Sequence, residues 1–298
     1  MKVRCHLKCT LLLAVGMLGA VRAETINWFS TSNKTNHTST GVVMDAAFQF
    51  QLGVFTGSFV PTAANVSQWT SFWVSAKSTS YSEISKSYNG THDFSGNAAP
   101  FTTGAKAYVW GRRTGSSNDE WILFRKSDWN WPTASIPEDF TLWSAATADE
   151  VILGSISPSG APFLKSAAVT SYAQWRNSQL AGEMLSSPND DPDRDGSSNL
   201  LEFVFGTSPT QSGAPTPTPI SFVDISGQRY LQISIPRLQN RLAMVSVEVS
   251  GDLVSWNSGN SYTVEVSNTP EAIVVRDIVP SGLGMPKRFV RARAVLLP

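Results

Sequence analysis

Residues 191–202 carry side-chain oxygens at a spacing suited to a hard metal ion. Counting from the first residue, acidic or amide side chains stand at positions 1, 3, 5, 9 and 12, and glycine stands at position 6. These residues are Asp191, Asp193, Asp195, Asn199, Glu202 and Gly196. Calcium takes about six to eight oxygen ligands, and 12-residue calcium loops place them at these positions. The spacing therefore predicts a calcium-binding loop.

Each residue of the loop has a distinct expected role. The three aspartates offer carboxylates from alternating positions, and Gly196 allows a sharp turn that points the backbone carbonyl of Ser197 at the ion. Asn199 ligates directly or through water, and Glu202 closes the shell with both carboxylate oxygens. Without a metal, the aspartates would repel one another. Two alternatives are an acidic surface turn and a register that begins one residue earlier, at Asp190.

Two short helices are expected to hold the loop. Thr170 can cap a helix that turns Tyr172 and Trp175 inward. After the loop, residues 200–205 are expected to form an exit helix that ends at Gly206. A helix, a loop and a second helix are the context that a calcium loop of this kind requires.

The run of residues 191–209 resembles the EF-hand-type calcium loops of secreted bacterial proteins and is similar to those of dockerins and thrombospondin type 3 repeats. The resemblance covers about 20 residues and follows the pattern D-x-D-x-D-G-x-x-N-x-x-E. It implies an extracellular loop with these side-chain ligands: Asp191, Asp193, Asp195, Asn199 and Glu202. The chain has one such loop, whereas dockerins have a duplicated pair, and this difference disfavours cohesin binding. The lack of a partner EF-hand disfavours a calcium sensor.

The N-terminus has the pattern of a cleaved secretory signal. Basic residues at positions 2, 4 and 8 precede an apolar run over residues 11–20, and Val21 and Ala23 place cleavage after Ala23. The apolar run is too short to cross a bilayer, which needs roughly 20 residues. We therefore expect residues 1–23 to be a signal peptide and the mature protein to be secreted or held at the cell surface.

The composition of the mature chain limits the classes of protein to which it can belong. Cys5 and Cys9 both lie in the signal, so the exported chain must be held by its core, by bound metal or by both, as in many bacterial exoproteins. The full chain has 23 basic and 23 acidic residues, and removal of the four basic residues of the signal leaves 19 against 23. This balance gives no indication of a nucleic-acid partner, which would require a clustered basic face.

Residues 24–166 are rich in tryptophan and are expected to form a mixed, β-dominated domain. Apolar and polar residues alternate over 48–54 as in a half-buried strand, and helical spacing of apolar residues follows Pro61 as far as Ala76. If extended, Trp129 and Trp131 would share one face and could form a flat platform that stacks on sugar rings. The alternative for these two residues is packing in the core of a domain without disulfides.

The second half of the chain is expected to be modular. Residues 167–206 form the helix–loop–helix unit, and residues 207–219 are a linker rich in proline, threonine and serine. Residues 220–298 contain short alternating strands separated by turns, which favours a small antiparallel β-sandwich. The fold class predicted for the whole chain is mainly β.

No catalytic residue is predicted. The mature chain has two histidines, His37 and His92, and neither accompanies a G-x-S-x-G motif or a paired Cys/His metal site. The favoured function is that of a secreted or cell-surface modular protein of structural or adhesive type, with one structural calcium. A carbohydrate-binding accessory protein and an exported hydrolase are the alternatives. The expected partner is a glycan or a component of the cell envelope, and the sequence does not indicate an oligomeric state.

Overall fold

The computed structural model describes residues 24–134, 140–213, 219–238, 240–282 and 287–296. The predicted signal peptide and residues 214–218 of the predicted linker lie outside the described residues. The chain is mainly β, with 43% strand, 11% helix and several antiparallel sheets, which confirms the predicted fold class.

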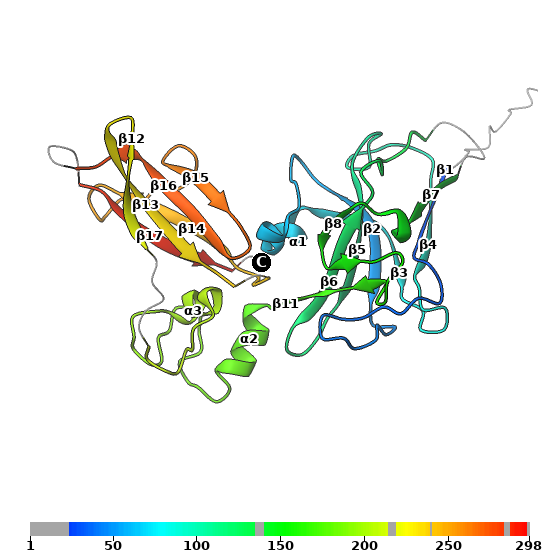
Figure 1. Cartoon of the computed structure of the whole chain (residues 1–298), viewed down its shortest axis with the longest axis horizontal. Coiled ribbons are helices and arrows are strands. Elements are labelled where there is room, and N and C mark those ends of the chain that lie inside the picture. Colours follow the sequence, from blue (N-terminus) through cyan, green and yellow to red (C-terminus); the bar gives the residue numbers. More distant parts are fainter. Residues whose placement is uncertain (1–23, 135–139, 214–218, 239, 283–286, 297–298) are drawn as a thin grey trace, which may run out of the picture.

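The N-terminal half contains two main sheets (Figure 1). The larger has the strand order β11-β6-β5-β2-β3, with β8 paired to β6, and the smaller has the order β4-β1-β7, in which β1 and β7 run parallel. Strands β9 and β10, which follow β8 in the chain, form a separate two-stranded sheet. The strands are β1 Glu24–Phe29, β2 Gln49–Phe55, β3 Trp73–Ser80, β4 Asn89–Phe94, β5 Ala107–Arg113, β6 Asp119–Arg125, β7 Phe140–Ser144, β8 Glu150–Leu153, β9 Ser155–Ile156, β10 Leu164–Lys165 and β11 Ala167–Val169.

The larger sheet is packed on both faces because its central strands are apolar on both sides. Phe50 and Leu52 of β2 point into a core that also contains Trp28 of the smaller sheet. On the opposite face, Trp69 packs against Trp110 of β5, with 5.7 Å between the ring centroids. The expected half-buried strand over 48–54 is confirmed as β2, and the side of β2 that carries glutamines lies on this second face.

The segment after Pro61 is helical for a shorter length than its spacing predicts. A 3-10 helix, η1 Ala63–Gln68, leads into α1 Trp69–Phe72, and the chain then becomes extended at Trp73. Trp73 and Ala76 lie on strand β3, where Trp73 pairs with Phe55 of β2. The predicted helical stripe is wrong at these two residues, because pairing with the neighbouring strand outweighs the local apolar spacing.

The tryptophans of the N-terminal half fill its cores. Trp129 and Trp131 are 2% and 1% exposed. The ring of Trp129 stacks on Trp143 with 5.5 Å between centroids, and Trp131 lies 4.7 Å from Phe101. The predicted sugar-stacking platform of Trp129 and Trp131 is therefore wrong, since a domain without disulfides uses such large side chains for its core.

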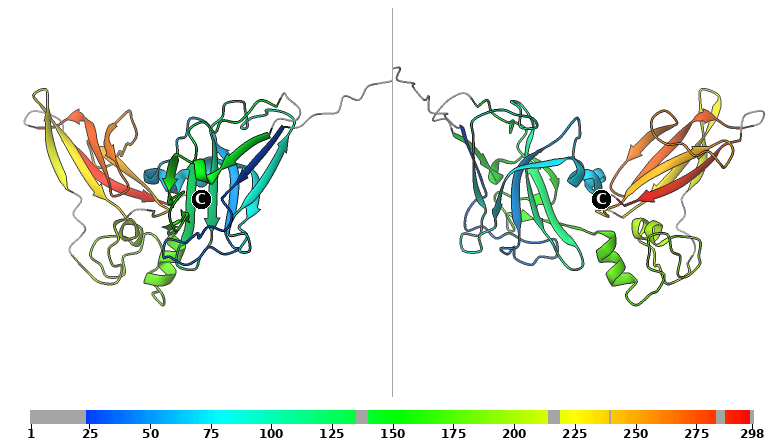
Figure 2. Two further views of the ribbon diagram at one scale, coloured as in Figure 1. Left: turned by 45° about the vertical axis from the view of Figure 1, so that its right-hand side comes forward. Right: turned by 180° about the vertical axis from the view of Figure 1, so that it is seen from behind.

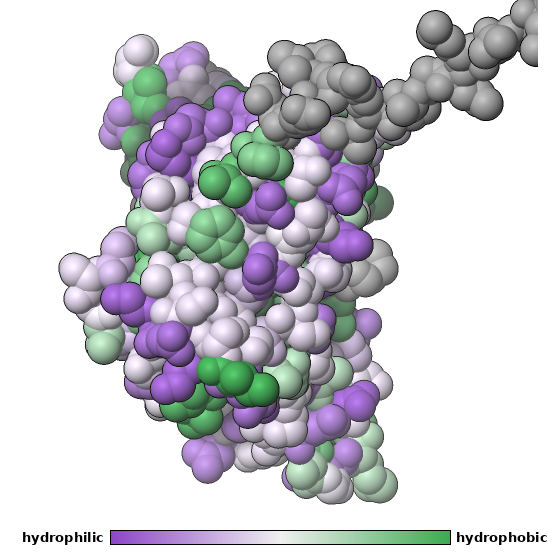
Figure 3. All heavy atoms as spheres, turned by 90° about the vertical axis from the view of Figure 1, so that its right-hand side faces the viewer, coloured by the Kyte–Doolittle hydropathy of each residue, from purple (hydrophilic) through white to green (hydrophobic). Residues whose placement is uncertain are grey.

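The outer surface over β1, β4 and β7 is a mixture of polar and weakly polar residues (Figure 3). Apolar side chains on this face form small separate groups. Within the described ranges, no helix is long and apolar enough to cross a membrane.

The C-terminal half contains two antiparallel sheets that face each other as in a small sandwich. One has the order β12-β13-β16-β15, and the other is the pair β14-β17. Alternation in β13 and β14 directs Ile233, Ile235, Val245 and Val247 into a common core. The strands are β12 Ile220–Ile225, β13 Gln228–Pro236, β14 Met244–Ser250, β15 Thr263–Asn268, β16 Ala272–Pro280 and β17 Phe289–Val295.

Two helices, α2 Tyr172–Gln179 and α3 Asn199–Phe205, lie at one end of these C-terminal sheets (Figure 2). Trp175 of α2 and Phe203 of α3 belong to the same buried cluster as Ile233 and Val247 of the strands. The helices and the sheets therefore share one core, and the loop between the helices is held by that core.

Candidate metal centre

Helix α2 fixes the chain that enters the acidic loop. It begins at Tyr172, and its N-cap is Ser171, one residue after the expected cap at Thr170. The Ser171 hydroxyl accepts from the Gln174 backbone N–H at 3.2 Å, and the Gln174 side-chain oxygen accepts from the Ser171 N–H at 2.9 Å. This reciprocal pair is a capping box and sets the start of the helix. The Tyr172 hydroxyl then donates to the carbonyl of Ser186 at 3.1 Å.

Helix α3 fixes the chain that leaves the loop. It ends at Gly206, whose φ of 81° is the left-handed conformation that glycine adopts without strain, as predicted. The ring of Phe203 lies 5.7 Å from Tyr172 and 5.5 Å from Trp175 of α2. Aromatic packing therefore sets the separation of the two helices, and the loop spans a fixed gap.

The three predicted aspartate ligands come together between α2 and α3. Asp191, Asp193 and Asp195 each place a carboxylate oxygen within 4.8 Å of the other two, and all three residues are half-buried. Three carboxylates at this separation repel one another unless a cation or protons lie between them. The group has the geometry of a site that could hold a metal ion.

Backbone donors inside the loop hold the carboxylates in place. Asp191 accepts from the N–H groups of Arg194 at 2.8 Å and Gly196 at 3.0 Å. Asp195 accepts from the N–H of Ser197 at 2.8 Å, and Gly196 turns the chain with a φ of 95°. The predicted ligand Ser197 is half-buried in this turn. The loop is therefore a set of tight turns with its acidic side chains bent back onto its own backbone.

Glu202 lies at the start of α3 and is 0% exposed. Its Oε1 accepts from the hydroxyl of Thr207 at 3.3 Å, whereas its Oε2 has no hydrogen-bond partner within the described part of the chain. Burial, together with the nearby charges of Asp193 and Asp195, raises the pKa of Glu202 to about 7. A carboxylate in this position is poorly stabilised without a cation.

Asn199 is also 0% exposed and has a positioning role. Its Nδ2 donates to the carbonyls of Leu185 at 3.1 Å and Ser187 at 2.9 Å, which ties α3 to the chain before the loop. Its Oδ1 is buried and has no partner among the described residues.

Among the described residues, three buried side-chain oxygens of the loop and of α3 have no hydrogen-bond partner. They are Oδ2 of Asp193, Oδ1 of Asn199 and Oε2 of Glu202. All three are acceptors, and leaving a buried acceptor unpaired costs about 1–3 kcal/mol. A bound cation is one chemical group that can satisfy several acceptors at once.

The loop register begins at Asp191 and not at Asp190. The carboxylate of Asp190 accepts from the N–H of Ser187 at 2.8 Å and is not part of the aspartate group. The carbonyl of Asp190 accepts from the N–H of Asn199 at 2.8 Å. Asp190 therefore joins the two ends of the loop, a structural role that the sequence pattern did not indicate.

Thr207 is a further residue that the sequence pattern missed. Its hydroxyl contacts Glu202, and its N–H donates to the Glu202 carbonyl at 3.2 Å. The loop pattern ends at position 12, so it contains no signal for a residue that returns to the centre after the helix.

Of the described histidines, neither His37 nor His92 belongs to the aspartate group. His92 lies on strand β4, where its ring stacks on Phe94 at 5.7 Å and meets the edge of Trp131. Its sequence neighbour Asp93 accepts from the hydroxyl of Thr25 at 2.7 Å.

Comparison of the chain with protein-family models, curated proteins and solved structures gave no match. The structure thus shows a mainly β chain with a half-buried aspartate group between two helices, where a metal ion could bind.

Proposed function

We propose that residues 191–202 bind one calcium ion that stabilises a secreted or cell-surface protein of structural or adhesive type. The observation that carries this proposal is Glu202, a fully buried carboxylate with one unpartnered oxygen and a raised pKa next to an aspartate group. The ligands in this proposal are the side chains of Asp191, Asp193, Asp195, Asn199 and Glu202, with the backbone carbonyl of Ser197.

The chemistry of these residues favours calcium over other metals. The ligand set contains only oxygen, whereas zinc sites are built largely from nitrogen and sulfur. Magnesium is smaller and keeps several of its waters, so a loop that supplies most of the shell from protein oxygens suits calcium better. Single loops of this kind in extracellular modules bind calcium with dissociation constants of about 10⁻⁴ to 10⁻³ M.

A structural role follows from where the loop is held. Both flanking helices belong to the core of the C-terminal sheets, and α2 follows directly after strand β11 of the N-terminal sheet. An ion at the loop would hold α3 against α2 and fix the joint between the two halves. The secretory pattern of residues 1–23 supports a location outside the cell, where free calcium is high enough to occupy such a site.

Thermal unfolding of the mature protein with calcium and with excess chelator tests the proposal. At a free calcium concentration of about 100 times the dissociation constant, binding stabilises the fold by about 2.7 kcal/mol. For a chain of this size the melting temperature should then rise by about 5–10 °C. Asp193→Asn should abolish most of the rise, whereas Asp224→Asn, on exposed strand β12, should retain it. A melting temperature that does not respond to calcium would overturn the proposal.

A further inference from the structure

A cleft of about 530 Å³ lies on the second face of the larger N-terminal sheet, remote in sequence from the acidic loop. Its volume is in the range of about 300–1,000 Å³ that small-molecule sites occupy. It is lined mainly by side chains of strands β2, β5 and β6 and of helix α1. Its lining residues include Gln49, Gln51, Thr70, Arg112, Asp119 and Trp121.

Strand register places three of these side chains in a row. Gln49 of β2 pairs with Arg112 of β5, and Arg112 pairs with Trp121 of β6. Directly paired residues of neighbouring strands point to the same face of a sheet. Gln51, two residues along β2, lies on that face as well. The cleft floor is therefore a regular part of the sheet, and its side chains stand on rigid elements.

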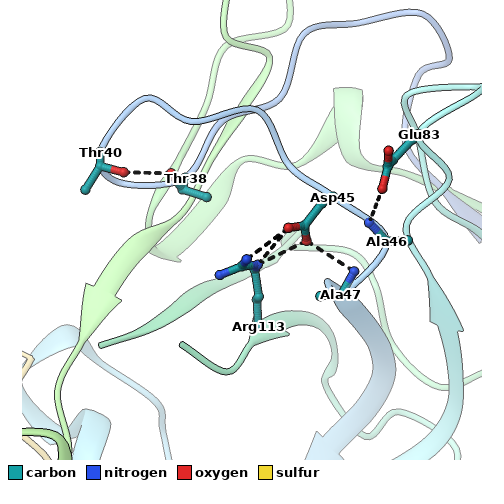
Figure 4. A network of polar contacts seen from close by, with 7 residues as sticks. All are labelled: Thr38, Thr40, Asp45, Ala46, Ala47, Glu83 and Arg113. Atoms are coloured by element: carbon teal, nitrogen blue, oxygen red, sulfur yellow. Dashed lines mark hydrogen bonds and ion pairs between the residues drawn. The ribbon is translucent and has the colours of Figure 1, made fainter. Parts of the chain in front are cut away.

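Arg112 differs from its neighbour Arg113 in having no carboxylate partner. The Arg113 guanidinium forms a two-pronged ion pair with Asp45, with Nε and Nη2 within 3.0 Å of its oxygens (Figure 4). Among the described residues, no carboxylate lies within ion-pair distance of Arg112. Its Nη2 donates to Oε1 of Gln51 at 2.9 Å, and its guanidinium lies 4.4 Å from the ring centroid of Trp110. The side chain is thus fixed in the cleft with donors left over.

An acceptor in the same cleft is fixed from another element. Oδ1 of Asp119 accepts from Nε2 of Gln174 on helix α2 at 2.7 Å and from the N–H of Gly115 at 3.3 Å. Asp119 is half-buried, and its charge acts favourably on Arg112 without a direct contact. The cleft therefore presents one fixed cation and one fixed anion that are not paired with each other.

We propose that this cleft binds a neutral sugar. Each hydroxyl of a sugar both donates and accepts, which matches a guanidinium donor, a carboxylate acceptor and the amide of Gln49. Trp121 is 4% exposed and its ring stacks on Trp69, so it closes the floor of the cleft and leaves selection of the ligand to the hydrogen-bonding groups. An acidic ligand would meet Asp119, and an apolar ligand would leave the charged groups unpaired.

This site is independent of the calcium proposal and of the buried pair Trp129 and Trp131. The signal that reveals it is the contrast between two adjacent arginines on one strand, one ion-paired and one not. Neither residue belongs to a sequence motif, and the site is formed by the pairing of three strands.

The test is a titration of the mature protein with neutral oligosaccharides of glucose, xylose and mannose and with oligosaccharides of uronic acids. Tryptophan fluorescence reports binding because Trp121 lines the cleft. We expect saturable binding of at least one neutral probe. Arg112→Gln and Asp119→Asn should each weaken it by about tenfold or more, the loss of one hydrogen bond to a charged group.

Two further variants separate binding from folding. Thr70→Trp changes an exposed residue of the cleft rim, fills the cleft without touching its buried groups, and should abolish binding while the melting temperature and the calcium response are retained. Arg229→Gln, at an exposed position of strand β13, should bind like the wild type. The proposal is overturned if no neutral probe binds, if uronic acids alone bind, or if Thr70→Trp and Arg112→Gln bind like the wild type.

Discussion

At the scale of single residues, the metal centre depends on a carboxylate that is buried beside other carboxylates. Glu202 has no solvent exposure, and among the described residues its carboxylate has one weak hydrogen-bond partner, the Thr207 hydroxyl at 3.3 Å. In the calcium-free protein its charge is therefore unfavourable, and in the calcium-bound protein the same charge would be a ligand. The same residue should thus destabilise one state and stabilise the other.

This residue predicts a pH dependence for the calcium-free protein. The pKa of Glu202 rises from 4.5 to about 7 on folding. Below pH 4.5 the raised pKa contributes fully to the free energy of unfolding. This contribution, about 3 kcal/mol at most, is lost as the pH rises through 7. Chemical denaturation in excess chelator at pH 5 and pH 7.5 should show this fall.

The control for the pH prediction is Glu202→Gln, which keeps the shape of the side chain without the charge. In this variant the fall in stability between pH 5 and pH 7.5 should largely disappear. The carboxyl of Asp45, whose pKa the Arg113 guanidinium lowers, acts with the opposite sign and at lower pH. An unchanged pH slope in Glu202→Gln would show that another group is responsible.

At the scale of elements, helix α2 is a connection between the two halves. Gln174 belongs to its capping box and also reaches strand β6, where its Nε2 donates to Asp119 and to the carbonyl of Gly115. One side chain therefore sets the start of the helix and its position on the sheet. Among the described residues, the side chain of the exposed Gln179 at the other end of α2 forms one hydrogen bond, to its neighbour Ser178 at 3.4 Å.

Replacement of these two glutamines tests that role. Gln174→Ala loses a cap and two hydrogen bonds and should lower the free energy of unfolding by about 1–3 kcal/mol. Gln179→Ala should change it by less than about 0.5 kcal/mol. Urea denaturation of both variants measures the difference, and equal effects would show that Gln174 does not join α2 to the sheet.

Local signals made the loop, the exit helix and the alternating strands predictable. The aspartates, Gly196 and Gly206 act within a few residues of one another, and strands such as β2 and β13 alternate clearly. Contacts between distant segments were not predictable. Apolar spacing alone predicts a helix through Trp73 because the pairing of Trp73 with β2 has no local signal, and the largely exposed strands β12 and β15 lack a clear alternation.

At the scale of the whole molecule, the two halves meet through backbone contacts just before helix α2. The N–H of Thr170, after β11, donates to the carbonyl of Asn240 at 3.0 Å, and the N–H of Leu242 donates to the Thr170 carbonyl at 2.9 Å. The helices packed beneath the C-terminal sheets continue from this point (Figure 2). Loss of the ion should therefore loosen the joint and leave the N-terminal cores intact.

Limited proteolysis can detect this local loosening. Arg194 is exposed in the loop and is a site for trypsin, and Lys86 is an exposed site in the N-terminal half. Removal of calcium should speed cleavage after Arg194 by about tenfold or more, because local opening then becomes easier. Cleavage after Lys86 should keep its rate. Equal acceleration at both sites would indicate global unfolding and contradict a local joint.

The central claim, one structural calcium ion held by Glu202 and the aspartate group, is tested most directly by isothermal titration of the mature protein with calcium. The account predicts one ion per chain, a dissociation constant of about 10⁻⁴ to 10⁻³ M and loss of binding in Glu202→Gln. Glu183→Gln, at an exposed site before the loop, should bind as the wild type does. No binding by the wild type, or unchanged binding by Glu202→Gln, would contradict the account.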